Sequence, residues 1–340
     1  MTVNGSKSLS SSELRARAAS RRLSGQRSRI TLGQSIIVLH RLDHWPTYLP
    51  SLLWGALVGA ASVSDLLTLE VAAALWSSAL VLAYGFAVNA LCDVRSDLRS
   101  RVKSSSAMAV RRLGTRTVRV VLVAEVVASL IISAVPTLTR GSGDYLPVVC
   151  LGALVVSTIY SVPPIRAKAR SSMGFVVMAL KSGTFPGLYG LAATHSQLEA
   201  IPLGVLLVAV SASVASRGLW HAIPDVHVDA AAGIRTFPVV HGAVRAGYVS
   251  LILATGSAVA ALFASTELFG LPLAFLACVG MFATIWFRLA TLSVDEPTNE
   301  RVTTSVASIP NERLNSRWNS ITLLCLCVAA FLHVTIPALP

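Results

Sequence analysis

Long apolar stretches alternate with short polar segments along most of this chain. Stretches near or above the roughly 20 apolar residues needed to cross a bilayer recur from residue 46 onward. They predict nine membrane-spanning helices, at about residues 46–64, 69–92, 117–136, 146–163, 172–193, 201–221, 246–266, 269–290 and 319–338. Three prolines within two of these stretches (Pro46, Pro50 and Pro186) should kink their helices. We therefore expect an all-α, polytopic membrane helical bundle.

Composition divides the chain into two parts. Residues 1–39 form a basic segment rich in Ser and Arg, which we expect to be a disordered tail. A cleavable transit peptide of an organelle can have the same composition, so this alternative stays open. Residues 40–340 contain no internal linker, and we expect them to form a single transmembrane domain.

The basic residues are distributed unevenly between the two sides of the predicted bundle. The formal net charge is +12, a value that could indicate binding to nucleic acid. With the N-terminus inside, however, clusters at 95–119, 166–170 and 288–317 share the inner side, whereas the opposite side keeps only Arg140. Membrane topology and attraction to anionic lipid explain this pattern, so no nucleic-acid partner is expected.

This asymmetry also predicts where the chain resides. Lys and Arg accumulate in cytoplasmic loops, so the N-terminus and the inner loops should face the cytoplasm. The preference for Arg over Lys and the many Ala and Val residues suggest a GC-rich bacterial genome. We expect a bacterial cell membrane, or an organelle membrane if residues 1–35 are a transit peptide.

Two acidic motifs follow the second and sixth apolar stretches. Asn89, Asp93 and Asp97 are spaced at i, i+4 and i+8, which stacks them on one face of a helix, and Asp225 and Asp229 repeat the i, i+4 spacing. Like charges at this spacing destabilise a helix unless a cation binds them. Mg²⁺ prefers oxygen ligands and bridges carboxylates to substrate phosphates. Because both motifs fall on the inner side, the sequence predicts a membrane enzyme that binds a diphosphate through Mg²⁺.

One charged residue lies well inside a predicted span. Lys181 is in the fifth apolar stretch, where a bare charge is costly and usually faces a cavity or a partner. It either contacts the diphosphate or pairs with a carboxylate; a snorkelling or neutral lysine is the alternative.

Several segments together resemble the UbiA superfamily of intramembrane prenyltransferases. The run from Asn89 to Asp97 is similar to the family's first motif, Asn-Asp/Gln-x-x-Asp-x-x-x-Asp, except that Ala90 replaces its second residue. Ile-Pro followed by Asp225-Val-His-Val-Asp229 is similar to the second motif. Tyr-Ser-Val-Pro-Pro-Ile-Arg-Ala-Lys at 160–168, Gly-Ile-Arg-Thr at 233–236 and Arg-Leu-Asp-His-Trp at 41–45 match three further family segments.

The resemblance implies a role for each candidate site residue. Asn89, Asp93 and Asp97 would hold one Mg²⁺ ion, and Asp225 and Asp229 a second. The candidates for clamping the substrate diphosphate are basic residues near the motifs, namely Arg166, Lys168, Arg217 and Arg235. The reaction chamber would be lined by Tyr160 and Ser161, with Lys181 near the reacting groups. Three residues keep other interpretations: Asn89 as a residue that only forms an interhelical hydrogen bond, and Arg166 and Lys168 as charges that only set the topology.

The resemblance implies a Mg²⁺-dependent prenyltransferase that transfers the allylic group of an isoprenyl diphosphate to a small acceptor, with an aromatic acceptor favoured. A UbiA-type terpene cyclase would use the same metal site, and only the shape of its chamber would differ. A transporter or a non-catalytic membrane protein is the more distant alternative. The donor chain length, the acceptor and the oligomeric state are left open by the sequence.

Overall fold

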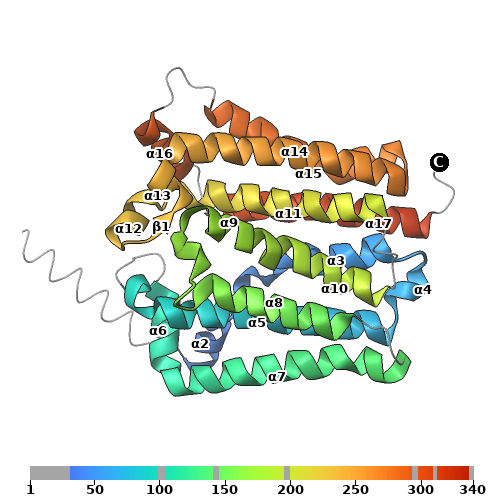
Figure 1. The fold of residues 1–340 in the computed structure, drawn as a ribbon, viewed down its shortest axis with the longest axis horizontal. Coiled ribbons are helices and arrows are strands. Elements are labelled where there is room, and N and C mark those ends of the chain that lie inside the picture. The colour runs from blue at the N-terminus through green and yellow to red at the C-terminus, as the bar shows by residue number, and fades with distance from the viewer. Residues whose placement is uncertain are drawn as a thin grey trace, which may run out of the picture.

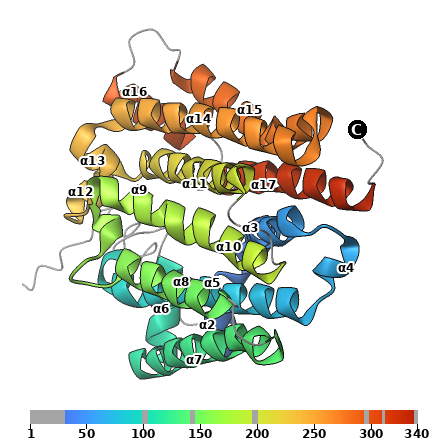
Figure 2. The ribbon, with the colours of Figure 1, turned by 45° about the vertical axis from the view of Figure 1, so that its right-hand side comes forward.

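The computed structural model of this chain is a bundle of long helices that run side by side (Figures 1 and 2). It describes residues 31–98, 104–140, 145–194, 200–292, 298–308 and 312–336. Every predicted span coincides with a helix, or with consecutive helical segments. These are α3 (Trp45–Gly59), α5 (Leu69–Asp97), α7 (Thr115–Arg140), α8 (Leu146–Ser161), α9 (Ser171–Ala179) continued by η3 (Leu180–Thr184) and α10 (Phe185–Ala193), α11 (Ile201–Ala222), α14 (Ala243–Phe269), α15 (Leu271–Leu292) and α17 (Glu312–Thr335).

The expected all-α bundle is confirmed, and the number of membrane spans stays a prediction. Within the described ranges, five helices are long and apolar enough to cross a membrane, namely α5, α7, α11, α14 and α15. The helix α8 and the segment Ser320–Thr335 of α17 are apolar but shorter. Large apolar side chains point outward from the long helices, as Trp76 and Trp286 do, which suits a surface that faces lipid.

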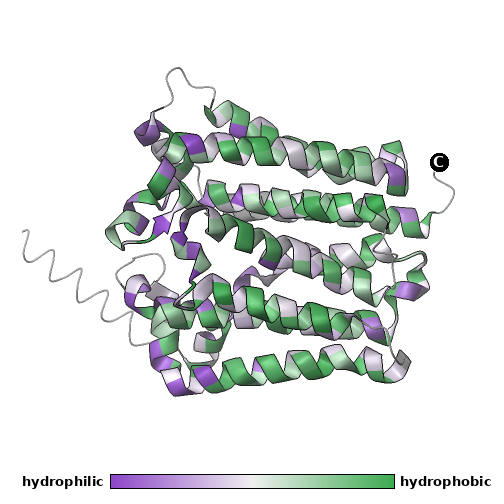
Figure 3. Cartoon of the chain, in the orientation of Figure 1, coloured by the Kyte–Doolittle hydropathy of each residue, from purple (hydrophilic) through white to green (hydrophobic). Residues whose placement is uncertain are grey.

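The remaining elements are short and connect the long helices. They are α2 (Leu32–Leu39), η1 (Leu42–His44), α4 (Val63–Leu66), α6 (Ser104–Leu113), η2 (Ala167–Ala169), α12 (Val226–Ala231), β1 (Arg235–Thr236), α13 (Phe237–His241) and α16 (Asn299–Ser308). Helices α6, α12, α13 and α16 gather at one end of the bundle, and α4 lies at the other (Figure 1). Hydrophilic residues are concentrated at the end that carries α6 and α12 (Figure 3). This polar end also holds both acidic motifs.

The last residues of the expected tail are helical. Thr31 caps α2 in a capping box with Gln34, which satisfies two backbone N–H groups at the helix start. Helix α2 packs against α6 at the polar end. Residues 1–30 lie outside the described residues, so their expected disorder stays a prediction.

Helices α3 and α10 approach each other closely because glycines line their contact. A Cβ atom added to Gly190 would lie 2.0 Å from the backbone nitrogen of Ala56, and one added to Gly55 would lie 2.1 Å from the carbonyl oxygen of Gly187. Gly187 in turn faces the ring of Trp54. Only glycine fits such backbone contacts, as is common where helices pack in membranes.

The fifth predicted span is interrupted at its centre. Its middle turn, η3, is π-helical and ends directly before α10, which has Pro186 in its first turn. Proline has no N–H to donate to the preceding turn, so the regular hydrogen-bond ladder cannot continue through it. The expected irregularity at Pro186 is therefore present as a π-helical turn. Such turns are frequent at functional sites, and this one carries Lys181.

Two large apolar clusters form the core. One joins α5, α7, α8 and α10 around residues such as Val81, Leu146 and Tyr189. The other joins α3, α11, α14, α15 and α17 around residues such as Trp54 and Leu206. The fifth span and α3 pack against each other in the middle of the bundle, where these two clusters meet (Figure 2). The candidate site occupies the space where the two groups meet.

Candidate active site

The first acidic motif lies at the polar end of α5, in the register that the sequence predicts. Asn89, Asp93 and Asp97 are all part of this helix, and Asp97 is its last residue. Asn89 and Asp93 are half-buried. Ala90 is 4% exposed and belongs to the apolar core, so the departure from the family motif falls on a position that packs inside the bundle.

The loop between α8 and α9 places two cations on this motif. The Arg166 Nη2 atom donates to the Asp93 Oδ1 atom at 2.8 Å. The Lys168 ammonium donates to Asp93 Oδ2 and also to Asn89 Oδ1. At the end of α8, the Ser161 hydroxyl donates to the same Asn89 oxygen at 3.1 Å. Five residues that the sequence marked separately therefore form one connected cluster, although the contacts span more than 70 residues along the chain.

This cluster has the geometry of a cation site. Oxygens of Asn89 and Asp93 converge on one point, which the Lys168 ammonium occupies. Burial lowers the pKa of Lys168, and the neighbouring Asp93 carboxylate partly opposes that shift. Carboxylate and amide oxygens are the ligands that Mg²⁺ prefers, so these residues fit the ion. Among the described residues, no three His, Cys, Asp or Glu side chains gather closely enough to form a metal site by themselves.

The second acidic motif lies beyond the sixth span, as its position after the predicted span 201–221 implies. Helix α11 stops at Ala222, Asp225 precedes the separate helix α12, and Asp229 lies within α12. Pro224 explains the break, because proline has no N–H with which to continue the hydrogen-bond ladder of α11. The i, i+4 relation survives, since the Asp229 N–H donates to the Asp225 carbonyl at 2.8 Å.

The segment after the second motif contacts the loop that follows α8. Arg235 and Thr236, which form β1, make bridges with the backbone of Arg170 and Ser171. The Ser171 hydroxyl also lies 3.2 Å from the His241 Nε2 atom. Arg235 itself is exposed. The two motif-bearing segments are thus joined at the polar end of the bundle.

Tyr160 stands between the two acidic motifs. The charges of Asp93 and Asp229 both act on its hydroxyl group. Its ring lies beneath the Lys181 ammonium, 5.2 Å from the ring centroid, and Phe86 lies 5.9 Å from the same ammonium. These are distances at which an aromatic face attracts a cation. Lys181 has no carboxylate partner among the described residues, so the expected pairing with an acid is not found.

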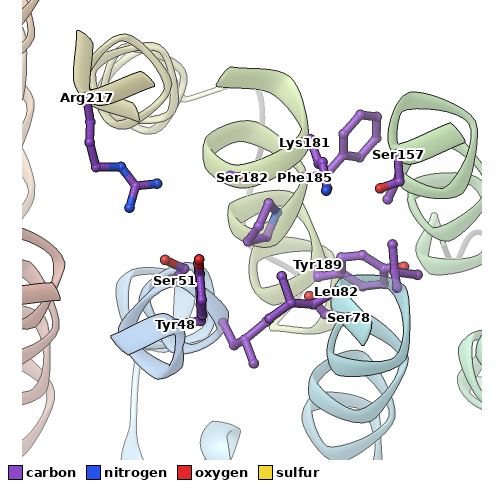
Figure 4. A pocket seen from close by; sticks show the side chains of 14 residues that line it. Tyr48, Ser51, Ser78, Leu82, Ser157, Lys181, Ser182, Phe185, Tyr189 and Arg217 are labelled. Atoms are coloured by element: carbon purple, nitrogen blue, oxygen red, sulfur yellow. The ribbon is translucent and has the colours of Figure 1, made fainter. Parts of the chain in front are cut away.

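A cavity of about 480 Å³, a volume that includes space open to solvent, lies between the helices of the bundle. It is lined by residues of α3, α5, α8, η3, α10 and α11 (Figure 4): Tyr48, Ser51, Leu52, Ser78, Val81, Leu82, Ala153, Ser157, Lys181, Ser182, Phe185, Pro186, Tyr189 and Arg217. We refer to this cavity as the chamber. Its lining contains two cations and several hydroxyl groups, and no acidic residue.

Lys181 and Arg217 line the chamber, and Asp93 does not. The Lys181 ammonium packs against Gly85, where an added Cβ would come within 2.8 Å of it. Gly85 precedes Asp93 by eight residues of α5, about 12 Å along a helix. Arg217 is five residues before the end of α11. In the described part of the chain, the cations that contact Asp93 are Arg166 and Lys168, and not these two residues.

Sequence reasoning missed several residues that the fold brings to this region. Tyr48 and Ser51 of α3 and Ser157 of α8 line the chamber, but isolated hydroxyls in apolar stretches carry no recognisable signal. Arg288, expected among the inner loop charges, is instead buried within α15, where it donates to Ser216 and stacks over the Trp220 ring. Its position within an apolar stretch was the available clue.

Glu125 also has a partner that its local sequence does not reveal. The His40 Nε2 atom lies 2.8 Å from its carboxylate, across the contact between the segment after α2 and α7. Burial alone would lower the pKa of His40, but the hydrogen bond and charge of Glu125 outweigh that effect and raise it.

The fold is shared with intramembrane prenyltransferase homologues of known structure. A UbiA homologue from Archaeoglobus fulgidus bound to GPP and Mg²⁺ superposes with a TM-score of 0.69 at 18% identity, covering 89% of this chain and 100% of that chain. The same homologue bound to DMAPP and Mg²⁺ gives a TM-score of 0.68 at 18% identity, with 89% and 99% covered. A digeranylgeranylglyceryl phosphate synthase structure gives 0.66 at 17% identity, with 88% and 99% covered. At these identities the likeness establishes the fold.

Family membership follows from the sequence itself. The family model described as the UbiA prenyltransferase family matches residues 48–309, which is most of the chain. The chain belongs to the UbiA prenyltransferase family, and it is an integral, multi-pass membrane protein of the prenyltransferase type. A search of curated proteins finds no match to this chain.

Proposed function

We propose that this protein is a Mg²⁺-dependent intramembrane prenyltransferase that transfers the allylic group of an isoprenyl diphosphate to a small aromatic acceptor. The observation that carries the proposal is the convergence of Asn89 and Asp93 oxygens on one cation, at the polar end of the bundle. The second acidic motif lies at the same end. The homologues whose structures contain DMAPP or GPP together with Mg²⁺ support this choice of donor and metal.

The acidic residues would hold the metal ions. In this proposal Asn89, Asp93 and Asp97 take one ion, and Asp225 and Asp229 take the other. Mg²⁺ bound there would neutralise charge on the diphosphate leaving group as the allylic C–O bond breaks. Carboxylates and substrate phosphates together complete such sites, which is why no ready-made cluster of three acids is required.

Arg166 and Lys168 would then exchange the Asp93 carboxylate for the substrate diphosphate as their partner. Arg166 and Lys168 contact Asp93 in the free chain and are within reach of any anion bound beside it. Once a divalent cation is held by the carboxylate, the two side chains are free to donate to the diphosphate, for which guanidinium geometry is well suited. Arg235, on the exposed side, would contact the same group.

The chamber residues would protect the reacting carbon and position the acceptor. When the C–O bond breaks, its electron pair leaves with the diphosphate, and the acceptor supplies the pair for the new bond before it loses a proton. Excluding water prevents hydrolysis of the allylic group. Tyr160 presents its ring at the boundary between the acidic motifs and the chamber, and Ser161 orients Asn89.

The cyclase and transporter alternatives fit the chamber less well. A terpene cyclase must carry a positive charge through several carbon centres, and the fixed positive charges of Lys181 and Arg217 would repel it. Transport proteins place their intramembrane carboxylates near the bilayer midplane, whereas both acidic motifs here lie at the polar end of the bundle.

The test uses purified full-length protein in detergent or lipid vesicles, with geranyl, farnesyl and geranylgeranyl diphosphates. Pyrophosphate and organic products are measured with Mg²⁺ or with excess chelator, and with or without 4-hydroxybenzoate and related phenols. We expect Mg²⁺-dependent pyrophosphate release together with a prenylated phenol. A cyclic hydrocarbon formed without any acceptor would instead establish the cyclase, and release that ignores the chelator would contradict the metal assignment.

A further inference from the structure

The second acidic motif lies on a segment that cannot fix its own position. Residues 223–242 join the end of α11 to the start of α14 and carry both Asp225 and Asp229. Within this segment α12 has six residues, β1 has two and α13 has five. Helices this short are marginal on their own. The geometry of the two carboxylates therefore depends on the contacts that hold the segment, above all at its two ends.

Arg288 holds the first of these ends. It belongs to α15, is 4% exposed, and donates through Nη1 to the Ser216 hydroxyl of α11 and, at 3.1 Å, to the Ser250 carbonyl of α14. Its guanidinium also lies 5.4 Å from the ring centroid of Trp220, a distance typical of a cation–π contact. Trp220 is buried and lies two residues before the end of α11. One side chain thus ties α11 to α14 next to the point where the segment begins.

The charge of Arg288 is not needed to join these two helices. The Ser216 hydroxyl already donates to the Ser250 carbonyl, and the Ser250 hydroxyl donates to the Ser216 carbonyl at 2.7 Å. No carboxylate pairs with Arg288 in the described part of the chain. A buried charge that lacks an acid adds little to stability, and charged residues inside a membrane bundle usually have a functional reason. We therefore expect Arg288 to do more than fill space.

Asn299 holds the other end of the segment. It is the first residue of α16, and its Oδ1 atom accepts the Val244 N–H at 3.0 Å. Val244 lies in the first turn of α14, where backbone N–H groups have no partner within the helix, so Asn299 supplies a cap from outside. The same amide packs on Gly242, where an added Cβ would lie 2.8 Å from Oδ1. Gly242 is the last residue of the segment, and its φ of 87° suits only glycine.

Apolar contacts join these two anchors into one unit. Val302 and Val306 of α16 are buried in a small apolar cluster that also contains Ile223 and residues of α15. Ile223 is the first residue of the segment and lies two positions before Asp225. Helix α16 lies at the polar end of the bundle, next to the start of α14 (Figure 1). The segment is thus held at both of its ends by α15 and α16.

We infer that Arg288 and Asn299 are positioning residues for the second acidic motif. They do not touch the substrate or the metal in this account, but fix the ends of residues 223–242 so that Asp225 and Asp229 are held in place. A metal site needs its ligands within about 0.5 Å of the productive geometry, and the residues behind the ligands commonly decide its affinity. This inference rests on the proposed function, in which Asp225 and Asp229 hold the second Mg²⁺ ion.

The first test counts bound metal without turnover. Full-length protein in detergent is dialysed to equilibrium against Mn²⁺, which stands in for Mg²⁺, with saturating geranyl S-thiolodiphosphate, a donor analogue whose C–S bond ionises very slowly. We expect two ions for each wild-type chain and one for Asp225→Asn. Arg288→Met and Asn299→Ala should each weaken the second ion by about 10-fold and leave the first unchanged. Wild-type affinity for both ions in these two variants would overturn the inference.

Matched variants separate positioning from folding. Arg245→Met makes the same change at an exposed residue of α14 and should bind both ions as the wild type does. Asn299→Asp keeps an oxygen acceptor for the Val244 N–H and should restore the affinity that Asn299→Ala loses. In Arg288→Met the two serines still bond each other, so the unfolding temperature without metal should stay within about 2 °C of the wild type. A large fall in that temperature, with weaker binding of both ions, would show a purely structural role and refute the inference.

The same measurements separate this inference from the proposed function. Loss of the second ion in Asp225→Asn, with full retention in the Arg288 and Asn299 variants, would refute the positioning role alone. Two ions retained in Asp225→Asn would instead refute the metal assignment on which the proposed function depends. In turnover, the Mg²⁺ concentration that gives half-maximal pyrophosphate release should rise about 10-fold in Arg288→Met, with the wild-type rate recovered at saturating Mg²⁺. A rate that stays low at every Mg²⁺ concentration would contradict a role through the metal site.

Discussion

The acidic cluster and the chamber differ in how their charged side chains are paired. In the acidic cluster, the Asp93 carboxylate is matched inside the chain by Arg166 and Lys168. In the chamber, Arg217 has no hydrogen bond or ion pair with any residue that the structure describes, and its Nε atom is unsatisfied. The first arrangement lets the protein fold without metal, because an ammonium occupies the point where the oxygens converge. The second keeps a charge unpaired until a ligand arrives. Comparing the two regions separates the interactions that stabilise the free protein from those that form only when a ligand binds.

Replacing Asp93 should have the largest effect. Asp93→Asn removes the charge on which both the internal ion pairs and the proposed metal site depend, so turnover should fall by about 10³-fold or more. Pyrophosphate release from wild-type and variant membranes measures this loss. Asp225→Asn should lose activity to a similar extent, although the residues around Asp225 differ from those around Asp93. Unchanged amounts of folded protein in the membrane serve as the control, and full activity of either variant would contradict the two-motif mechanism.

Removing a paired and an unpaired cation should change stability in opposite directions. Lys168→Met leaves Asp93 and Asn89 without their ammonium donor, and should lower the stability of the unliganded protein by about 1–3 kcal/mol. Arg217→Gln should leave it unchanged or raise it by about 1 kcal/mol, since no partner is lost. Unfolding temperatures measured in one detergent at one scan rate provide the comparison. Destabilisation of similar size in both variants would show that Arg217 is paired in the free protein.

The smallest effect concerns the pair of His40 and Glu125, which contacts neither acidic motif in the described part of the chain. The pKa of His40 is raised above its ordinary value by Glu125, so the pair contributes stability that is fully present below about pH 6.5 and is lost as the pH rises through the raised pKa. We expect this contribution to be about 1 kcal/mol. The unfolding temperature of the wild type should therefore fall as the pH rises through neutrality, relative to that of His40→Gln. Parallel pH profiles for the two proteins would argue against the pair.

Local patterns in the sequence were sufficient for the long helices and for the first motif. Apolar length predicted where helices form, and the i, i+4, i+8 spacing correctly predicted that Asn89, Asp93 and Asp97 share α5. The sixth span was predicted to end near residue 221, and α11 ends at Ala222. The sequence did not predict that Asp229 would lie in a separate short helix, α12.

Partners distant in the chain could not be predicted. Lys168 and Asp93 are 75 residues apart, and Arg288 and Ser216 are 72 apart. The sequence around each of these residues does not predict which helix will lie beside it, because that depends on how the whole bundle packs. The chamber has the same origin: Tyr48, Ser157 and Arg217 come from three different helices and become neighbours only in the folded protein.

The glycine contact between α3 and α10 has a consequence for how the protein is made. The first long helix packs on its sides against α10 and α17, and these are the fifth and the last of the predicted spans. A ribosome delivers the chain from its N-terminus, so α3 enters the membrane well before either neighbour exists. Its glycine-lined face stays exposed to lipid until the fifth span is inserted, and its other side until the ninth span is inserted. Assembly of this bundle therefore depends on segments made long after α3.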